Sequence, residues 1–365
     1  MVITSIQLEN YRNYAALELN FDRGTNIFYG DNAQGKTNIL EAVYLCGTTK
    51  SHRGSKDREV IRFKEEEAHI RMCLDKNGSS YKIDMHLKKN RAKGIAVNGV
   101  PIRKASELLG IGNFVFFSPE DLNIIKSGPG ERRRFIDLEL SQLSKLYLYN
   151  LSKYNKIVNQ RNRLLKDIFL HPEYEDMLDV WDDQMASCGE AVIREREEFV
   201  RVLNGIAGGI HRKLSGEREE LLIRYEKSVE GPQFLDLLKK NRERDKRFKM
   251  TLLGPHRDDL SFTIGDADIR RYGSQGQQRT AALSLKLAEI ELVKRKIKDM
   301  PILLLDDVLS ELDSSRQKYL LDSIHDIQTL ITCTGLDDFV EHRFPLDRVF
   351  QVEGGAVFRK AQGQK

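Results

Sequence analysis

The eight residues GDNAQGKT at positions 30–37 decide the fold class of this chain of 365 residues. They match the pattern G-x-x-x-x-G-K-[ST] at every defined position. The run TNIFYG at residues 25–30 is short, apolar and ends in glycine, which is typical of a β-strand followed by a turn. Residues 36–47 repeat apolar positions at helical spacing. A glycine-rich loop between a strand and a helix predicts a phosphate-binding loop in an α/β nucleotide-binding domain.

Each residue type in this loop has a chemical reason. Gly30 and Gly35 let backbone N–H groups turn inward around a β-phosphate, and the helix N-terminus adds partial positive charge. Lys36 is expected to reach the β- and γ-phosphates and to be a candidate catalytic residue, and Thr37 to offer its hydroxyl to Mg²⁺. The predicted ATP-binding residues of the loop are Gly30, Asp31, Asn32, Ala33, Gln34, Gly35, Lys36, Thr37 and Asn38.

A second stretch, ILLLDD at residues 302–307, supplies carboxylates. Its continuous apolar run is typical of a strand buried on both faces of a sheet. Asp306 would then lie at the carboxyl edge of the sheet and hold Mg²⁺ directly or through water. Asp307 would be the base, or would position the attacking water, and is a candidate catalytic residue. The alternative for both residues is an ordinary turn at the end of a strand.

The stretch YGSQGQQRT at residues 272–280 forms a second helix start with small and polar residues at its tip. Ser274, Gly276 and Gln277 could cap a γ-phosphate from the side opposite the loop at residues 30–37. Either one chain folds completely around one nucleotide, or two chains meet head to tail and share it. The spacing along the sequence does not decide between the two arrangements.

The texture of the sequence changes twice along the chain. The first 50 residues and residues 68–100 alternate in strand fashion, with turns at KNG and VNG. From Ser118-Pro119 to about Met250 the pattern is mostly helical, and two apolar stripes, interrupted only by Arg161, predict an antiparallel helical hairpin. An ordinary helical core is the alternative for these stripes. We therefore expect an α/β domain from residues 1–118 and 251–365, with a helical lobe at 119–250.

The amino-acid composition indicates a globular protein and argues against a membrane protein. The chain is 40% hydrophobic and 31% charged, which is typical of a globular protein with a well-solvated surface. It has no run of 18 apolar residues, and its four cysteines lack metal-ligand spacing. We therefore expect a cytoplasmic protein with free thiols and no membrane partner.

Basic residues gather in one part of the chain. Residues 50–110 carry 15 basic and 8 acidic residues, a local charge of +7 against +4 for the whole chain. Lys88, Lys89, Arg91 and Lys93 are the candidate contacts to DNA phosphates, and a plain solvated hairpin is the alternative.

The combination resembles the ABC-type ATPases. Their signature motif, which acts in trans, is similar to Ser274-Gln275-Gly276-Gln277, and their D-loop is similar to the stretch SELD, with Ser310 and Asp313 at its ends. Further stretches make the chain closely similar to the RecF family of bacterial recombination mediators, an SMC-like branch of that class. These stretches are NYRNY at 10–14, KSHR at 50–53, PEDLNIIKSGPGERRRFID at 119–137 and GPHRDDL at 254–260.

The resemblance implies a fold and a function. The fold would be an ABC-type P-loop ATPase head with an inserted helical lobe that contains a short antiparallel hairpin. The protein would bind ATP with Mg²⁺, form an ATP-dependent head-to-tail homodimer, and bind double-stranded DNA at gaps and junctions with single strands. A weak, DNA-stimulated ATPase would serve this switch. RecR would be a direct partner, with functional links to RecO and RecA in gap repair and SOS induction.

Several positions depart from the pattern or have open roles. Asp307 stands where most ABC proteins have glutamate, which suits slow turnover. A switch histidine is not evident around Thr332-Cys333-Thr334, and Ser127 stands where glycine is expected. Arg12 could contact the nucleotide or couple it to the signature helix, and a surface arginine is the alternative. His52 and Arg53 could line the adenine or DNA side, and His256 and Arg257 have an unknown role, with a structural bridge between lobes as the alternative. Arg132, Arg133 and Arg134 are expected to pair with carboxylates at the lobe interface.

Two rival functions remain compatible with the sequence. One is an ABC-type subunit that energises another machine such as a transporter, although the helical lobe is larger than such a subunit needs. The other is a DNA clamp whose ATPase is vestigial.

Overall fold

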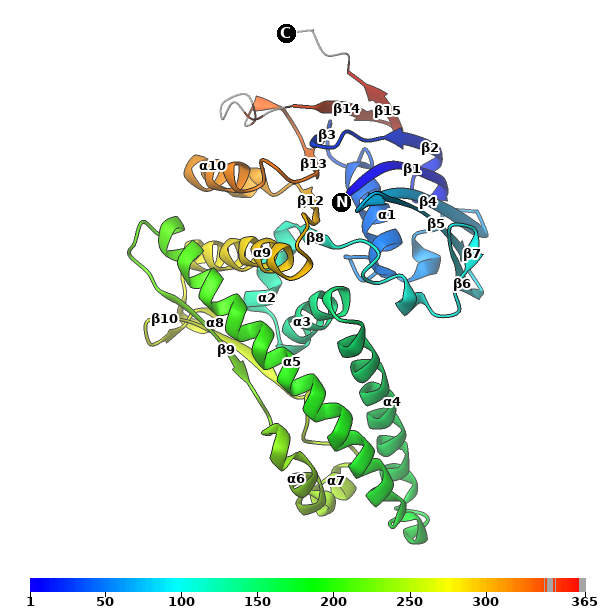
Figure 1. The fold of residues 1–365 in the computed structure, drawn as a ribbon, viewed down its shortest axis with the longest axis vertical. Helices are drawn as coiled ribbons and strands as arrows, with labels where there is room; N and C mark the ends of the chain where they lie inside the picture. Colours follow the sequence, from blue (N-terminus) through cyan, green and yellow to red (C-terminus); the bar gives the residue numbers. More distant parts are fainter. Residues whose placement is uncertain (338, 340–343, 345, 361–365) are drawn as a thin grey trace. The chain divides into compact units, whose positions relative to one another are not determined.

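The computed structural model describes residues 1–337, 339, 344 and 346–360, and these form two compact units. The head unit comprises residues 1–121 and 289–365, and the helical unit comprises residues 122–288. The first boundary lies three residues from the expected position at residue 118. The second lies inside a helix rather than at residue 250. The α/β head with an inserted helical lobe, expected from the sequence, is the fold observed (Figure 1).

One sheet of the head unit carries the loop at residues 30–37 that is predicted to bind phosphate. Its strand order is β15-β14-β3-β13-β12-β8, and all neighbours pair in parallel except the terminal hairpin of β14 and β15. The inner strands β12 and β13 are fully buried, and the continuous apolar run of β12 suits such a position. The bounds are β3 Thr25–Tyr29, β8 Phe114–Phe117, β12 Ile302–Asp306, β13 Thr329–Cys333, β14 Arg348–Glu353 and β15 Ala356–Arg359.

The other sheet of the head unit is antiparallel, in the order β2-β1-β4-β5-β6-β7. The two predicted turns are confirmed, because Asn77-Gly78 joins β4 to β5 and Asn98-Gly99 joins β6 to β7, and all four residues have positive φ. Asparagine and glycine tolerate this conformation best, which is why such pairs close hairpins. The bounds are β1 Val2–Tyr11, β2 Tyr14–Asn20, β4 Glu67–Lys76, β5 Ser79–Lys88, β6 Arg91–Val97 and β7 Val100–Pro101.

Helix α1 (Lys36–Thr48) lies against both sheets of the head unit (Figure 1). Eleven of its 13 residues are buried, because strands cover it from two sides. Gly47 lets the helix approach β8, since a Cβ there would lie 2.2 Å from the ring of Phe114. Helix α10 (Ser314–Ser323) follows β12 in the same unit. The predicted phosphate-binding loop therefore precedes a helix that is packed between the two sheets.

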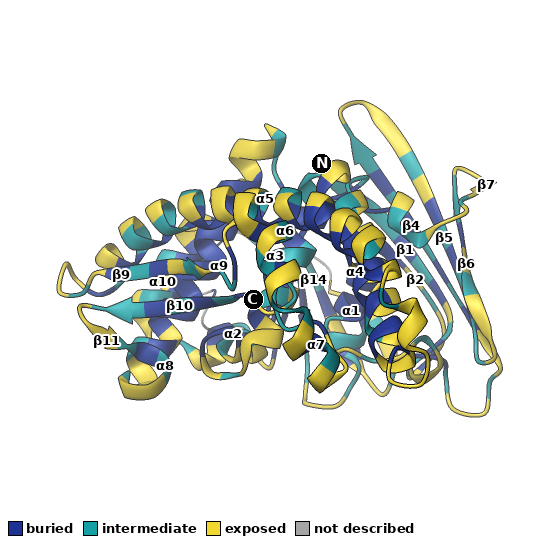
Figure 2. Ribbon diagram, turned by 90° about the horizontal axis from the view of Figure 1, so that it is seen from below, coloured by how far each residue is buried: buried dark blue, intermediate teal, exposed yellow. Residues whose placement is uncertain are grey.

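The predicted helical hairpin is confirmed in the helical unit. Helices α4 (Lys145–Asp167) and α5 (Met177–Leu214) pack against each other, and buried positions alternate with exposed ones along both (Figure 2). The residue that interrupts the first stripe, Arg161, is fully buried, and it pairs with Asp182 and Asp245. The other helices are α2 Leu122–Lys126, α3 Pro129–Leu143, α6 Phe234–Lys240, α7 Arg242–Phe248, α8 Ile269–Tyr272 and α9 Gln275–Ile297.

A small sheet in the helical unit was not predicted as such. Strands β9 (Leu221–Glu226), β10 (Asp259–Ile264) and β11 (Ala267–Asp268) form an antiparallel sheet in the order β11-β10-β9. Residues 221–226 lie in the segment that the sequence pattern predicts to be mostly helical. Because β10 pairs with β9 along its whole length, residues beyond 250 belong to the helical unit, and the second boundary moves to residue 288.

Candidate nucleotide-binding site

The loop between β3 and α1 has the backbone that a phosphate cradle needs. Gly30, Ala33 and Gly35 have φ values of 145°, 64° and 111°. Gly30 also lacks room for a side chain, since a Cβ would lie 2.4 Å from the carbonyl oxygen of Val352. Gly35 caps α1 without a side-chain hydrogen bond, and the first turn of α1 holds no acidic residue. The N–H groups and the dipole at this helix end are therefore available to an anion.

Lys36 lies with its ammonium over the loop. Its Nζ donates to the carbonyl oxygens of Gly30 at 2.5 Å and Asp31 at 2.7 Å, and the residue is only 7% exposed. Burial lowers the pKa of Lys36, although the charges of Asp307 and Asp306 act in the opposite direction. Burial removes water that would stabilise the charged ammonium, and the negative charge of a nearby phosphate group would stabilise it instead.

Three oxygen-bearing side chains meet at the carboxyl edge of the parallel sheet. The Thr37 hydroxyl and the Thr332 hydroxyl both donate to Oδ1 of Asp306, each at 2.7 Å. Two adjacent ligands of an octahedral Mg²⁺ at about 2.1 Å lie about 3.0 Å apart, close to the spacing of the Thr37 and Asp306 oxygens. Mg²⁺ is commonly held by one or two protein ligands together with substrate phosphates. Thr37 and Asp306 therefore fit a Mg²⁺ that a bound triphosphate completes.

Asp307 is held in a strained backbone conformation beside this group. Its φ is 51°, and its N–H donates to Thr332 Oγ1 at 3.0 Å and to Thr332 O at 3.2 Å. Burial raises the pKa of Asp307, and the neighbouring charge of Asp306 raises it further. A carboxyl group with a raised pKa beside a predicted γ-phosphate is suited to accept a proton from water. The sequence already showed that Asp307 has a shorter side chain than the usual glutamate and that Thr332 lies in the stretch where a histidine is expected. It did not predict the contacts of Thr332 with Asp306 and Asp307.

The two predicted D-loop residues, Ser310 and Asp313, follow Asp307 in the sequence. The Ser310 hydroxyl donates to the carbonyl oxygen of Asp307 at 2.8 Å. Asp313 caps α10, because its carboxylate accepts from the N–H of Arg316 at 3.1 Å. The segment is therefore tied at one end to Asp307 and at the other to a helix start.

The turn between β1 and β2 contacts the loop at residues 30–37. The sequence patterns did not predict most of the contacts that this turn makes. Asn13 Nδ2 donates to Gln34 O at 3.2 Å, and Asn38 Nδ2 donates to Asn13 Oδ1 at 2.8 Å. The Tyr14 hydroxyl donates to Gly35 O at 3.1 Å. Both Asn13 and Tyr14 lie in the stretch NYRNY that carried part of the family resemblance. That stretch was the available signal, although it did not indicate what the side chains contact.

Arg12 lies in the same turn but points to α1. Its Nε and Nη2 each donate to one carboxylate oxygen of Glu41 at 2.7 Å, and Nη2 also donates to Ser55 at 2.8 Å. Glu41 is fully buried in the head unit. Burial alone would raise the pKa of Glu41, but the bonds from Arg12 and Ser51 bring it below the usual range. This pairing describes Arg12 in the single chain, and its predicted contact with nucleotide stays a prediction.

The predicted signature residues lie at the start of α9 in the helical unit. Ser274, Gln275 and Gly276 are exposed to solvent. Ser274 Oγ accepts from the N–H of Gln277 at 3.2 Å, and Gln277 Oε1 accepts from the N–H of Ser274 at 2.9 Å. This reciprocal pair is a capping box, which satisfies backbone N–H groups at the N-terminus of a helix. The tip is thus both ordered and accessible.

The four candidate DNA contacts differ in how far their charges are already paired. Lys88 pairs with Glu67 at 3.1 Å, Lys89 with Glu66 at 2.9 Å, and Lys93 with Asp57 at 2.9 Å. Arg91 is exposed at the start of β6 and forms no ion pair in the described part of the chain. Arg91 is therefore the member of this set with most charge left for a phosphate.

The residues with open roles lie apart from the loop at 30–37 in the contacts they make. The His52 ring stacks on Phe116, with centroids 3.9 Å apart, and Arg53 is exposed. His256 contacts the Tyr154 hydroxyl at 2.6 Å and Thr251 O at 3.1 Å, and burial lowers its pKa to about 4.

The neighbouring arginines make similarly internal contacts. Arg257 donates to Thr251 O at 3.0 Å. Arg132 pairs with the Asp259 carboxylate at 2.6 Å, but within the helical unit and not at an interface between the lobes, and Arg133 donates to the carbonyl oxygen of Asp258. Arg134 has an exposed side chain, and its pairing with a carboxylate stays a prediction. These contacts hold the helical unit together.

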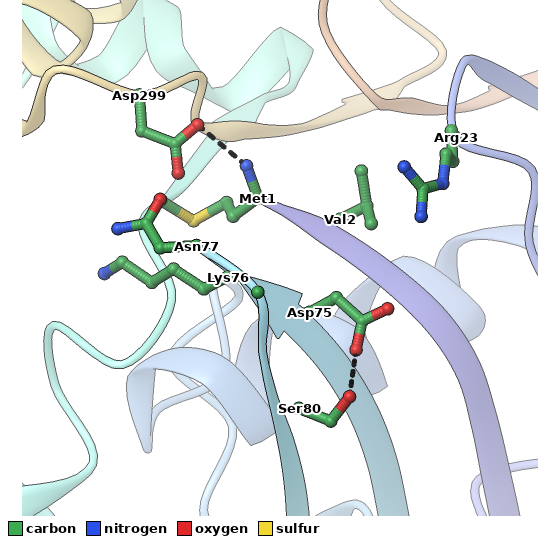
Figure 3. A pocket seen from close by; sticks show the side chains of 9 residues that line it. Met1, Val2, Arg23, Asp75, Lys76, Asn77, Ser80 and Asp299 are labelled. Carbon is green, nitrogen blue, oxygen red and sulfur yellow. Dashed lines mark hydrogen bonds and ion pairs between the residues drawn. The ribbon is translucent and has the colours of Figure 1, made fainter.

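The head unit also has a polar surface pocket of about 370 Å³. Figure 3 shows that the amino group of Met1 pairs with Asp299 and that Ser80 donates to Asp75 across this pocket. Neither the loop at 30–37 nor Asp306 lines it, so it is not the candidate nucleotide site. The lining residues are Met1, Val2, Arg23, Asp75, Lys76, Asn77, Gly78, Ser80 and Asp299.

No helix in the part of the chain that the structure describes is long and apolar enough to cross a membrane.

Comparison with known proteins gives consistent results over the full length. The model of the RecF/RecN/SMC N terminal domain matches residues 2–356. The DNA replication and repair protein RecF of Agathobacter rectalis is 63% identical over 98% of this chain and 99% of its own length. RecF of Lachnoclostridium phytofermentans is 61% identical over the same shares. A solved structure of the recombination mediator protein RecF-ATP in the RecFOR pathway is 37% identical, with a TM-score of 0.92 over 98% of this chain and 97% of that one.

Proposed function

The chain belongs to the RecF/RecN/SMC N-terminal-domain family, and from that premise we propose that it is a DNA replication and repair ATPase driven by nucleotide-dependent dimerisation. ATP with Mg²⁺ binds to the loop at residues 30–37 of one copy. The exposed tip of α9 in a second copy closes over the same triphosphate. The dimer is therefore head to tail, with two shared nucleotides.

The observation that carries this proposal is the meeting of Thr37, Asp306 and Lys36 at one sheet edge. A hydroxyl, a carboxylate and a buried ammonium suit a metal-bound triphosphate better than any uncharged ligand. ATP is the nucleotide named for the solved RecF relative that matches this chain over nearly its whole length. These residues bind and orient the phosphates, and bound Mg²⁺ would neutralise charge on them.

The accessible tip of α9 supports the shared arrangement. An exposed helix start with a serine cap offers N–H groups and a hydroxyl to an anion. Sharing a nucleotide stabilises the dimer by the binding energy of the phosphates, and hydrolysis removes that energy and releases the partners. Asp307 accepts the proton of the attacking water in this scheme. Its short side chain and raised pKa suit slow turnover.

DNA binding is the proposed output of dimerisation. Contacts from Arg91 and the neighbouring lysines to phosphates would position duplex DNA without reading its sequence. The names of the relatives support a role in DNA replication and repair and in recombination through the RecFOR pathway. Within that role, the proposal includes gap repair and SOS induction, with RecR as partner and RecO and RecA acting in the same process. The four free thiols and a DNA substrate suit the cytoplasm. The names of these relatives favour this function over the transporter subunit.

Sedimentation velocity with and without ATP, and again with gapped duplex DNA, tests the proposal. We expect a monomer without nucleotide, a dimer with ATP and Mg²⁺, and a larger DNA complex only when ATP is present. A monomer under all conditions, with DNA affinity that ignores ATP, would contradict it.

A further inference from the structure

A carboxylate outside the sequence motifs holds the signature tip in its ordered form. Gln277 Nε2 donates to Oε1 of Glu219 at 2.9 Å. The same side chain uses its other end, Oε1, to accept from the N–H of Ser274. A carboxylate can only accept, so Glu219 determines which end of the Gln277 amide faces Ser274.

Glu219 is itself held in place before any ligand arrives. It lies in the connection between α5 and β9, where the Ser215 hydroxyl accepts from the Glu219 N–H at 3.3 Å. Gly216 and Glu217, the two residues that turn the chain, have φ values of 65° and 61°. The Glu217 N–H also donates back to Arg212 O at 2.8 Å. The carboxylate therefore stands on a closed turn that follows directly from a 38-residue helix.

The second oxygen of Glu219 faces a buried ring. His211, fully buried near the end of α5, contacts Glu219 Oε2 through Nε2 at 3.2 Å, and its Nδ1 lies 3.2 Å from Ser284 Oγ on α9. The Glu219 carboxylate thus contacts both the end of α5, through His211, and the first turn of α9, through Gln277. Its side chain retains 26% exposure, so the pair with Gln277 lies at the edge of the tip.

This arrangement leaves the tip prepared for an anion. Ser274 Oγ accepts from the Gln277 N–H, so the hydroxyl proton of Ser274 is free to donate outward. The N–H groups of Gln275 and Gly276 belong to the first turn, and the helix itself gives them no acceptor. If Gln277 rotated, the N–H of Ser274 would lose its acceptor and the cap would loosen.

We propose that Glu219 is a positioning residue for the phosphate-binding tip of α9: it orients Gln277, and through Gln277 it holds Ser274, Gln275 and Gly276 in the geometry that closes on the nucleotide of a partner copy. The inference rests on the proposed head-to-tail dimer. In this inference Glu219 does not contact the phosphates itself, but it positions the residues of the tip that do.

The test is a double-mutant cycle of E219A and Q277A, with E220A as matched control. Glu220 is the exposed neighbour of Glu219, and among the described residues its one ion pair is with Arg212, at 3.7 Å. The dimer dissociation constant is measured by sedimentation in saturating hydrolysis-resistant ATP analogue. Loss of a hydrogen bond to a charged group typically changes an equilibrium constant by about tenfold. We expect each single variant to weaken the dimer by about that factor and E220A to match the unaltered chain.

Non-additivity separates positioning from general damage. Because Glu219 controls the tip through Gln277 in this proposal, the double variant should be no weaker than either single variant. Analogue affinity of the isolated copy should be the same in all variants, since the loop at 30–37 is unaltered. Additive losses, or an E219A dimer as tight as the unaltered one, would overturn the inference.

A second measurement needs no dimer. Amide hydrogen exchange at Ser274 in the nucleotide-free protein should be faster in E219A than in the unaltered chain and unchanged in E220A. Equal exchange in E219A and the unaltered chain would overturn the positioning role. Failure of the unaltered chain to dimerise with the analogue would instead count against the proposed function, so the two failures are distinguishable.

Discussion

Replacing Arg161 by methionine should destabilise the helical unit through a carboxylate left without its cation. Arg161 is fully buried, and it donates to Asp182 at 2.7 Å and to Asp245 at 2.6 Å. Asp182 keeps a second cation, because Arg242 donates to it at 2.8 Å. Among the residues that the structure describes, Asp245 keeps only the N–H of Leu252, at 3.1 Å. The cost of R161M therefore falls mainly on Asp245.

The size of the loss in the free energy of unfolding depends on Asp245, which can take up a proton and so avoid an unpaired buried charge. Its pKa is already raised, because burial outweighs the charge of Arg161. Without that arginine the folded protein can protonate Asp245, and neutralising an aspartate of ordinary pKa about 3.9 at pH 7 costs about 4 kcal/mol. Removing one partner of a buried ion pair typically costs about 3–5 kcal/mol. We therefore expect R161M to lower the free energy of unfolding by about 4 kcal/mol at pH 7.

The assay is urea unfolding followed by the fluorescence of Trp181, the single tryptophan, which packs against the core of the helical unit. The double variant R161M/D245N should recover most of the loss, because asparagine removes the charge and can still accept from Leu252. The deficit of R161M should also shrink as pH falls toward 4, since folded Asp245 then binds a proton that the unfolded chain does not. A loss below about 1 kcal/mol, or no recovery in the double variant, would refute the reasoning.

Further predictions concern nucleotide binding, acid stability and DNA. K36M should remove the ammonium that meets the phosphates, so that sedimentation shows a monomer at any ATP concentration and DNA binding no longer responds to ATP; a persistent ATP-driven dimer would contradict this. His256 has a pKa lowered to about 4 in the fold against about 6.5 when unfolded, so its contribution to stability is present above pH 6.5 and is lost as pH falls to 4. Unfolding of H256Q, monitored by Trp181, should show a shallower loss of stability over this range, by up to about 1.4 kcal/mol per pH unit, and an unchanged slope would count against a neutral buried histidine. R91E should weaken DNA binding for all sequences and reduce its salt dependence, measured by fluorescence anisotropy, and an unaltered salt slope would remove Arg91 from the interface.

Local patterns predicted the parts of the fold that depend on neighbouring residues. The loop at 30–37 and the strand at 302–306 each occupy one short stretch, so their residue types identify them without knowledge of the rest. The stripes of α4 and α5 follow helical spacing over more than 20 residues each, which makes the hairpin visible. Strand β9 has only six residues and takes its identity from pairing with β10, so its own alternation was too short to stand out.

Contacts between distant residues could not be predicted in the same way. Arg161 looked like a break in an apolar stripe because its partners, Asp182 and Asp245, lie 21 and 84 positions away. In the sequence, Thr332 stood out only because no switch histidine occurs near it, whereas in the structure its hydroxyl donates to Asp306. Glu219 carries no motif, and its contact with Gln277 spans 58 positions. Such pairs depend on the folded chain, and a single sequence contains no pattern that relates them.

Mixing two inactive variants tests the shared nucleotide most directly. K36M lacks the phosphate-binding ammonium, and S274R blocks the tip of α9 while leaving the loop at 30–37 able to bind ATP. In a head-to-tail pair of the two variants, one nucleotide site combines two defects and the other is intact. We predict that each variant alone neither dimerises nor hydrolyses ATP, and that the equimolar mixture forms heterodimers and regains hydrolysis. A mixture as inactive as its components, under conditions where the unaltered chain dimerises and hydrolyses ATP, would show that each site is completed within one chain.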